Sequence, residues 1–147
     1  LTVMFRNRLL TDFPDLFYRS VSGIRWLVVL LSLHGKCRSL NDVLGVYRIH
    51  TRGIYQSRHQ TLEGRIAYLE DQIRDARMWN EYFQGQYSSE VKTFCSKRAK
   101  SIVRFALTHG QIYRAMAYAW LIDIDSLRAK RSRLVVRALR ALANVFL

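Results

Sequence analysis

Two arginines around a histidine form the first group of residues that could do chemistry. Arg48, His50 and Arg52 occur in the string YRIHTRG. The planar guanidinium fork matches phosphate geometry, so Arg48 and Arg52 could bind a diphosphate or an acidic acceptor group. In a chain with this much arginine, a solvated basic face is the alternative. His50, likewise, could be a strand-end residue whose imidazole bonds a backbone group.

A second position of interest lies in the string SGIRW, residues 22–26, at the start of an apolar run. Ile24 would lie in the first turn of a helix, where free N–H groups and the helix dipole favour a carboxylate over a hydrocarbon. Either this position has no chemical role, or an acidic residue is missing from it.

The third group is a basic stripe on the predicted last helix. Its four residues, at helical spacing, are Lys130, Arg133, Arg137 and Arg140. An apolar face lies beside the stripe and is made of Leu134, Ala138, Leu142 and Val145. The helix could pack on a core with a solvated basic back, or it could lie in an anionic membrane surface.

Composition limits the classes of protein to consider. A chain of 147 residues with 50% hydrophobic residues can bury a core, so we expect it to fold. The net charge of +13 is uneven, because residues 91–147 hold 12 Lys and Arg against 2 Asp and Glu. Such an excess favours phosphate-bearing partners. However, no helix-turn-helix, zinc-finger or RNP-like pattern occurs, so we expect no specific nucleic acid as partner.

Cysteines, leaders and membrane segments add further expectations. Cys37 and Cys95 have no CxxC spacing, and we expect two buried thiols in a reducing cytosol. No basic and apolar leader with a cleavage site follows Leu1, so we expect no signal peptide. The longest near-uniform apolar run, residues 26–33, is shorter than the ~20 residues of a membrane-spanning helix.

The elements that must position these residues are mostly helices. Residues 2–5 and 43–50 are apolar and β-branched, which predicts two strands, and the run from Ile24 to His34 predicts a helix between them. From Thr61, apolar residues at steps of three and four predict a long helix, with an i,i+4 pair between Glu70 and Arg74. Further helices follow, broken near residues 108–111 and 123–126. The expected fold class is therefore α+β, mostly α.

The order of the motifs TVMFRN, FPDLF, SGIRW, HGK and YRIH over residues 2–60 resembles the acceptor-side half of bacterial family-two glycosyltransferases of the GT-A fold. The resemblance implies a partial GT-A α/β layer, with two or three strands and a helix, in residues 1–60. Residues 61–147 would be a helical, basic extension.

The resemblance also implies roles for single residues. The family's general base, the aspartate of a Gly-Asp pair, corresponds to Ile24, which cannot accept a proton. His50 matches the family's histidine that completes coordination of the nucleotide's Mn²⁺ or Mg²⁺. Arg25 and Trp26 would lie at the acceptor mouth, where Trp26 could stack on a sugar ring or could be the first core residue of its helix.

These implications lead to two alternative functions. The first is the C-terminal portion of an inverting glycosyltransferase, which transfers sugar from a nucleotide-sugar to a glycan or lipid-linked acceptor. Residue 24 offers no base, and the one Asp-x-Asp string, Asp123-Ile124-Asp125, lies in the helical extension. We therefore expect the chain to be inactive alone and to bind no metal alone. The second is a non-catalytic basic helical module that binds an anionic membrane surface or a partner protein. In both cases we expect a cytoplasmic protein that could lie peripherally at the inner membrane face.

Overall fold

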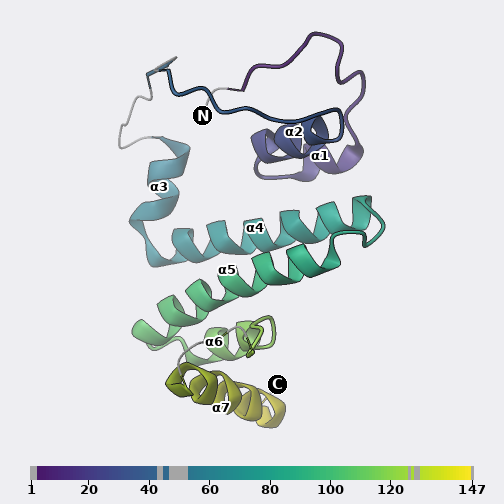
Figure 1. Ribbon diagram of the computed structural model, residues 1–147. Coiled ribbons are helices and arrows are strands. Elements are labelled where there is room, and N and C mark those ends of the chain that lie inside the picture. Colours follow the sequence, from purple (N-terminus) through teal and green to yellow (C-terminus); the bar gives the residue numbers. More distant parts are fainter. Residues whose placement is uncertain (1–2, 43–44, 47–52, 126, 128–129, 147) are drawn as a thin grey trace. The chain divides into compact units, whose positions relative to one another are not determined.

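The computed structural model describes residues 3–42, 45–46, 53–125, 127 and 130–146. It divides into two compact units, residues 1–53 and 54–147. Helices are the only regular secondary structure in the described part (Figure 1). The prediction of an α/β layer is therefore wrong, since residues 3–5 form no strand and no sheet is present among the described residues. Most of the second predicted strand, residues 43–50, lies outside the described residues.

Two helices make up the regular structure of the first unit. α1 is a short helix, Asp15–Arg19, that begins after Pro14, and α2 spans Gly23–Ser32. Proline suits a helix start because its fixed φ angle is compatible with the first turn. α2 confirms the predicted helix, and its buried residues are Trp26, Leu30 and Leu31.

The second unit contains five helices in its described part. These are α3 (Ile54–Gln60), α4 (Leu62–Tyr82), α5 (Ser88–Thr108), α6 (Ile112–Ala119) and α7 (Lys130–Phe146). In Figure 1, α4 and α5 lie side by side as an antiparallel hairpin, and α6 and α7 continue the stack from α5. The predicted division between residues 60 and 61 falls at the junction of α3 and α4.

The ends of α4 follow from its sequence. Thr61 caps the helix, because its Oγ1 accepts a hydrogen bond of 3.0 Å from the Gly64 N–H. A side chain at position 64 would clash with the Arg58 carbonyl oxygen, so the tight approach of α3 requires glycine. At the other end, Gly85 has φ +81° and donates to the Asn80 carbonyl, which turns the chain into α5.

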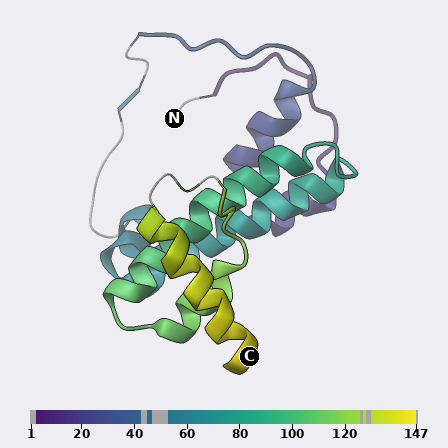
Figure 2. The same cartoon turned by 60° about the horizontal axis from the view of Figure 1, so that its bottom comes forward.

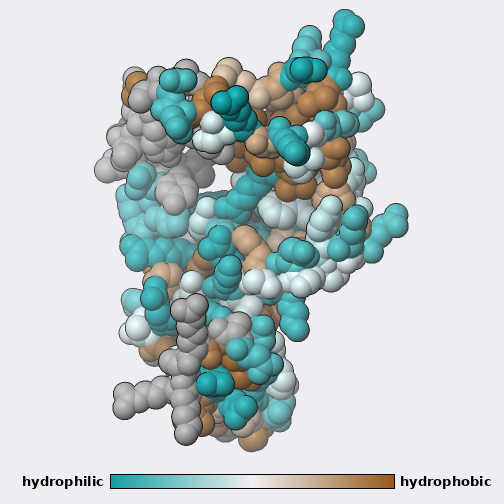
Figure 3. Space-filling view, in the orientation of Figure 1, coloured by the Kyte–Doolittle hydropathy of each residue, from teal (hydrophilic) through white to brown (hydrophobic). Residues whose placement is uncertain are grey.

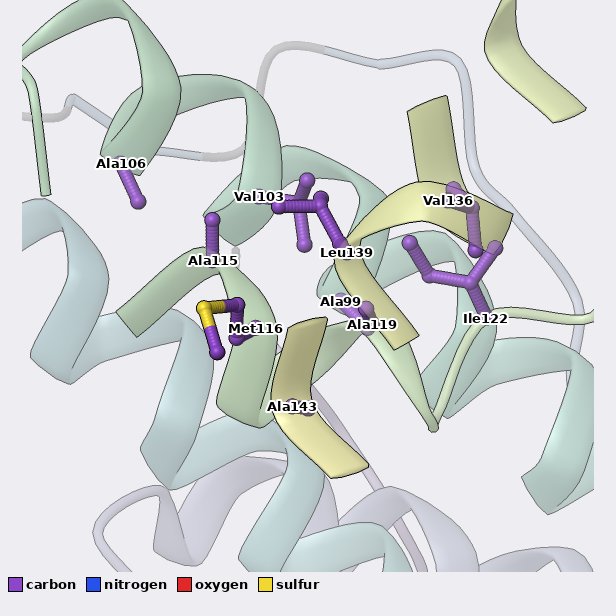
Figure 4. Packing of buried hydrophobic residues seen from close by; sticks show 10 residues of the cluster. All are labelled: Ala99, Val103, Ala106, Ala115, Met116, Ala119, Ile122, Val136, Leu139 and Ala143. Carbon is purple, nitrogen blue, oxygen red and sulfur yellow. The ribbon is translucent and has the colours of Figure 1, made fainter. Parts of the chain in front are cut away.

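Two hydrophobic clusters hold the second unit together. The cluster between α4 and α5 contains Ile66, Leu69, Ile73, Ala76, Cys95 and Ile102. The cluster shared by α5, α6, α7 and the α6–α7 connection contains Ala99, Val103, Ala106, Ala115, Met116, Ala119, Ile122, Val136, Leu139 and Ala143 (Figure 4). The predicted apolar stripe of α4 is thus confirmed as its buried face.

Candidate functional site

The start of α2 is the first candidate site, and the structure leaves it open. Ser22 precedes the helix without a side-chain capping bond, and the first turn contains no acidic residue. Ile24 lies in this turn with 43% of its surface exposed. The local geometry therefore offers helix N–H groups beside a hydrocarbon side chain, and Ile24 itself provides neither a base nor a charge.

The two neighbours of Ile24 differ in accessibility. Arg25 is half-buried, while Trp26 is fully buried, at 0% exposed. A buried ring cannot stack on a sugar in solvent, so of the two interpretations of Trp26 the structure favours a core residue of α2. The expected role of Arg25 at an acceptor stays a prediction.

The motif with the histidine is not described. Arg48, His50 and Arg52 all lie outside the residues that the structure describes. Within the described residues, no group of three or more His, Cys, Asp or Glu side chains could hold a metal ion. The metal that the resemblance implies stays a prediction, because His50 lies outside the described residues.

The basic stripe of α7 is divided by the structure. Arg137 is exposed and Arg133 is half-buried, whereas the side chain of Lys130 is outside the described set. Arg140 turns toward α6: its guanidinium donates to the carbonyl oxygens of Ala119, Trp120 and Ile122 at 3.1, 3.3 and 2.6 Å. Arg140 thus has a structural role, because its Nε and Nη2 groups donate to backbone carbonyls.

The apolar residues of α7 form two faces. Val136, Leu139 and Ala143 are buried and point into the shared cluster (Figure 4). The face singled out from the sequence is a different one and is exposed. We call it the outer face of α7. It contains the four predicted residues, Leu134, Ala138, Leu142 and Val145, and the exposed Val135 beside them. The helix therefore packs through one apolar face and presents a second to solvent.

A groove of about 450 Å³ in the second unit was not foreseen from the sequence. Arg77 of α4, Lys92 and Cys95 of α5, Trp120 and Arg140 are among its lining residues. The α4–α5 hairpin brings Arg77 and Lys92 together, although no local motif joins them. Burial raises the pKa of the Cys95 thiol, so it is not an activated nucleophile. Asp123 also lines the groove, but the basic residues outnumber it, so the groove could attract an anion.

Two carboxylates of α4, Glu63 and Glu70, contact α6, and no local sequence motif indicated these contacts. Arg114 pairs with both Glu63 and Glu70, and Gln111 donates to Glu63 at 2.9 Å. Hydrogen bonds from Gln111 and Arg114 hold the pKa of Glu63 below its usual value. Because arginine and amide donors occupy these carboxylates, they stabilise the helix pair and are not free for general acid–base work.

No described helix of the chain has both the length and the apolar character that a membrane crossing requires. Comparisons with protein-family models, with curated protein sequences and with solved structures found no match to this chain.

Proposed function

We propose that this chain is the acceptor-side, C-terminal part of an inverting glycosyltransferase similar to family two. The observation that carries the proposal is the ordered run of motifs over residues 2–60, from TVMFRN through FPDLF, SGIRW and HGK to YRIH. Each motif alone is weak, and their order and spacing together are more specific. The structure counts against one part of this run, because residues 3–5 of TVMFRN form no strand.

The position of Ile24 supports the proposal. In inverting transfer, the acceptor oxygen bonds to the anomeric carbon as the bond to the nucleotide diphosphate breaks, and a base takes the hydroxyl proton. The resemblance assigns that base to residue 24. Ile24 lies in an open first turn of α2, where a carboxylate would be well placed electrostatically. The position is thus suited to an acid and lacks one, so we expect no transfer by the chain alone.

The surface of the first unit also supports the proposal. Many large apolar side chains there are exposed, and Figure 3 shows hydrophobic residues gathered over α1 and α2. The exposed large apolar residues of the whole first unit are Met4, Phe5, Tyr18, Val21, Ile24, Leu33, Leu40 and Val46. Exposed apolar surface of this extent is typical of an interaction site. A donor-binding half, on the same or a separate chain, would cover part of it.

The test has two stages. First, the chain alone is titrated with UDP and Mn²⁺ by calorimetry and assayed for nucleotide release from a panel of UDP-, GDP- and dTDP-sugars. We expect no micromolar site and no release. Second, the full chain is joined to the donor-binding half of an active family-two enzyme, with that enzyme's acceptor. The Ile24→Asp variant of this chimaera should release nucleotide faster than the unchanged chimaera.

A matched control is available on the same helix. Leu33 is similarly exposed and lies at the opposite end of α2, so Leu33→Asp adds the same charge away from the proposed mouth and should give no gain. A metal-dependent nucleotide site in the chain alone would contradict the proposal. So would a chimaera that binds nucleotide normally yet gains nothing from Ile24→Asp.

The second candidate function is a non-catalytic basic helical module. The observation that favours it is the outer face of α7, which is apolar, exposed and flanked by Arg133 and Arg137. The two candidates differ in where ligand affinity resides. A transferase part should bind nucleotide independently of α7, whereas a membrane module should lose vesicle binding when α7 is altered.

A further inference from the structure

We propose that the outer face of α7 docks on an anionic lipid surface, with the helix lying parallel to the membrane plane. This inference does not depend on the proposed transferase activity. It starts from the division of α7 into two apolar faces. Val136, Leu139 and Ala143 are buried, while Leu134 and Val145 are 57% and 74% exposed. Figure 2 turns α7, in yellow, toward the viewer, and no other helix of the second unit covers it from this side.

The outer face is continuous along the helix. Leu134, Ala138, Leu142 and Val145 follow one another at steps of four, four and three, which places them in one row of an α-helix. An ordinary surface helix would carry polar residues in this row. The row is instead apolar over three turns, from Leu134 to Val145, and the contacts with α6 leave it in solvent.

Cations flank the apolar row on one side. Arg133 and Arg137 lie between the buried face and the outer face, and the chain has no acidic residue after Asp125. Within the described part of the chain, no carboxylate pairs with either arginine. Arg140 is excluded from this surface role, because its guanidinium is committed to the carbonyls at the end of α6. The proposed phosphate contacts are therefore made by Arg133 and Arg137.

An anionic membrane surface fits this arrangement better than other occupants. A second copy of the chain would bring +13 against +13, so repulsion opposes self-association through a basic face. A nucleic acid would pair with the arginines but would leave the leucine and valine row in water. A lipid interface takes up both, because the apolar row enters the acyl boundary and the guanidinium groups remain at the phosphates.

The experiment is co-sedimentation of the full chain with vesicles, either phosphatidylcholine alone or with 30% phosphatidylglycerol. We expect binding to the anionic vesicles that weakens as salt rises. The double variant Arg133→Gln, Arg137→Gln should lower the partition coefficient roughly tenfold or more, because each juxtamembrane cation adds an appreciable attraction. A second double variant, Leu134→Ser with Leu142→Ser, should lower binding at high salt as well.

The matched control removes the same charge elsewhere. Lys97→Gln with Arg104→Gln neutralises two exposed cations of α5 and should change binding much less than the α7 arginine pair. Circular dichroism checks that all variants keep their helices. Equal binding to both vesicle types would overturn the proposal. So would an equal loss of vesicle binding in the α5 double variant and in the α7 double arginine variant. Tight binding to duplex DNA that ignores the leucine variants, without vesicle binding, would assign the surface to nucleic acid instead.

Discussion

Arg140 of α7 donates a hydrogen bond of 2.6 Å to the carbonyl oxygen of Ile122, just beyond the end of α6. The same guanidinium donates to the carbonyls of Ala119 and Trp120 and lies over the Trp120 ring, 5.2 Å from its centroid. The last carbonyls of a helix have no partner within the helix. Arg140 therefore closes the C-terminal end of α6 from a neighbouring helix and fixes α7 against it.

Replacing Arg140 should destabilise the second unit. Arg140→Met keeps most of the aliphatic stem but leaves the carbonyls without their charged donor, and we expect a loss of about 2 kcal/mol in the free energy of unfolding. Arg140→Lys should lose less than Arg140→Met, because the ammonium group is still a charged donor. Some loss should remain, since one ammonium group cannot span three carbonyls as the guanidinium does. Urea denaturation measures both. Arg137→Met is the control, because Arg137 is exposed; an equal loss in this variant would contradict the structural role of Arg140.

An acid in the first turn of α2 should be tolerated. Because Ile24 is 43% exposed, Ile24→Asp gives up partial burial and gains up to about 1 kcal/mol from the helix N–H groups and dipole. Leu33→Asp adds the same charge at the negative end of the helix and should destabilise it. Amide hydrogen exchange of α2 in the full chain reports both local stabilities. If Ile24→Asp speeds amide exchange throughout α2 and Leu33→Asp does not, the first turn of α2 does not accept a carboxylate.

The contact between Tyr118 and Glu70 should make stability depend on alkaline pH. The Tyr118 hydroxyl donates to Glu70 Oε1 at 2.9 Å. Burial and the nearby Glu70 carboxylate raise the pKa of Tyr118 to about 12. The neutral phenol is thus favoured in the folded state, while the unfolded pKa stays near 10. Its contribution is complete below about pH 10 and is lost as the pH rises through 12.

The measurement for this prediction is urea denaturation between pH 8 and 12. Tyr118→Phe should cost about 1 kcal/mol at pH 8, and its difference from the unchanged chain should shrink above pH 10. Tyr113, on the same helix, is 70% exposed, so Tyr113→Phe should change stability by less than about 0.5 kcal/mol. A Tyr118→Phe cost that stays constant to pH 12 would contradict the titration.

The two thiols should react at very different rates. Cys37 is exposed, which corrects the expectation that both cysteines are buried, while Cys95 is buried and its thiol pKa is raised by that burial. A disulfide reagent under native conditions should therefore modify one thiol quickly and the second only as the second unit opens. Cys37→Ser should abolish the fast phase and Cys95→Ser should keep it. Two fast phases would show that the helix hairpin is loosely packed.

The apolar repeat was enough to predict α4. The stripe from Ile66 to Ala76 became its buried face, and Thr61 supplies its cap. The strand at residues 2–5 was wrong because an apolar, β-branched string only becomes a strand when another strand pairs with it, and the described residues offer none. The spacing of apolar residues in one segment shows which of its side chains could be buried. It does not show which other segment packs against them.

The candidate site was harder to predict because its key contacts are distant in sequence. The expected pair of Glu70 with Arg74 is replaced by contacts of Glu70 with Arg114 and Tyr118, while Arg74 pairs with Asp71. Arg140 fits the basic stripe by its spacing, yet its partners are carbonyls at the end of α6. In α7, two apolar stripes run side by side, and the sequence alone gave no means to choose the buried one.

The contacts between α4 and α6 have a consequence for the order of assembly. Glu63 and Arg114 are 51 positions apart, and Glu70 and Tyr118 are 48 apart, whereas α4 and α5 are joined by the short turn 83–87. The connection between α5 and α6, residues 109–111, is also short. Closing a short loop costs less entropy, so we expect the α4–α5 and α5–α6 contacts to form before the α4–α6 ion pairs. Because these ion pairs form late, they should slow the unfolding of the second unit and leave its folding rate nearly unchanged.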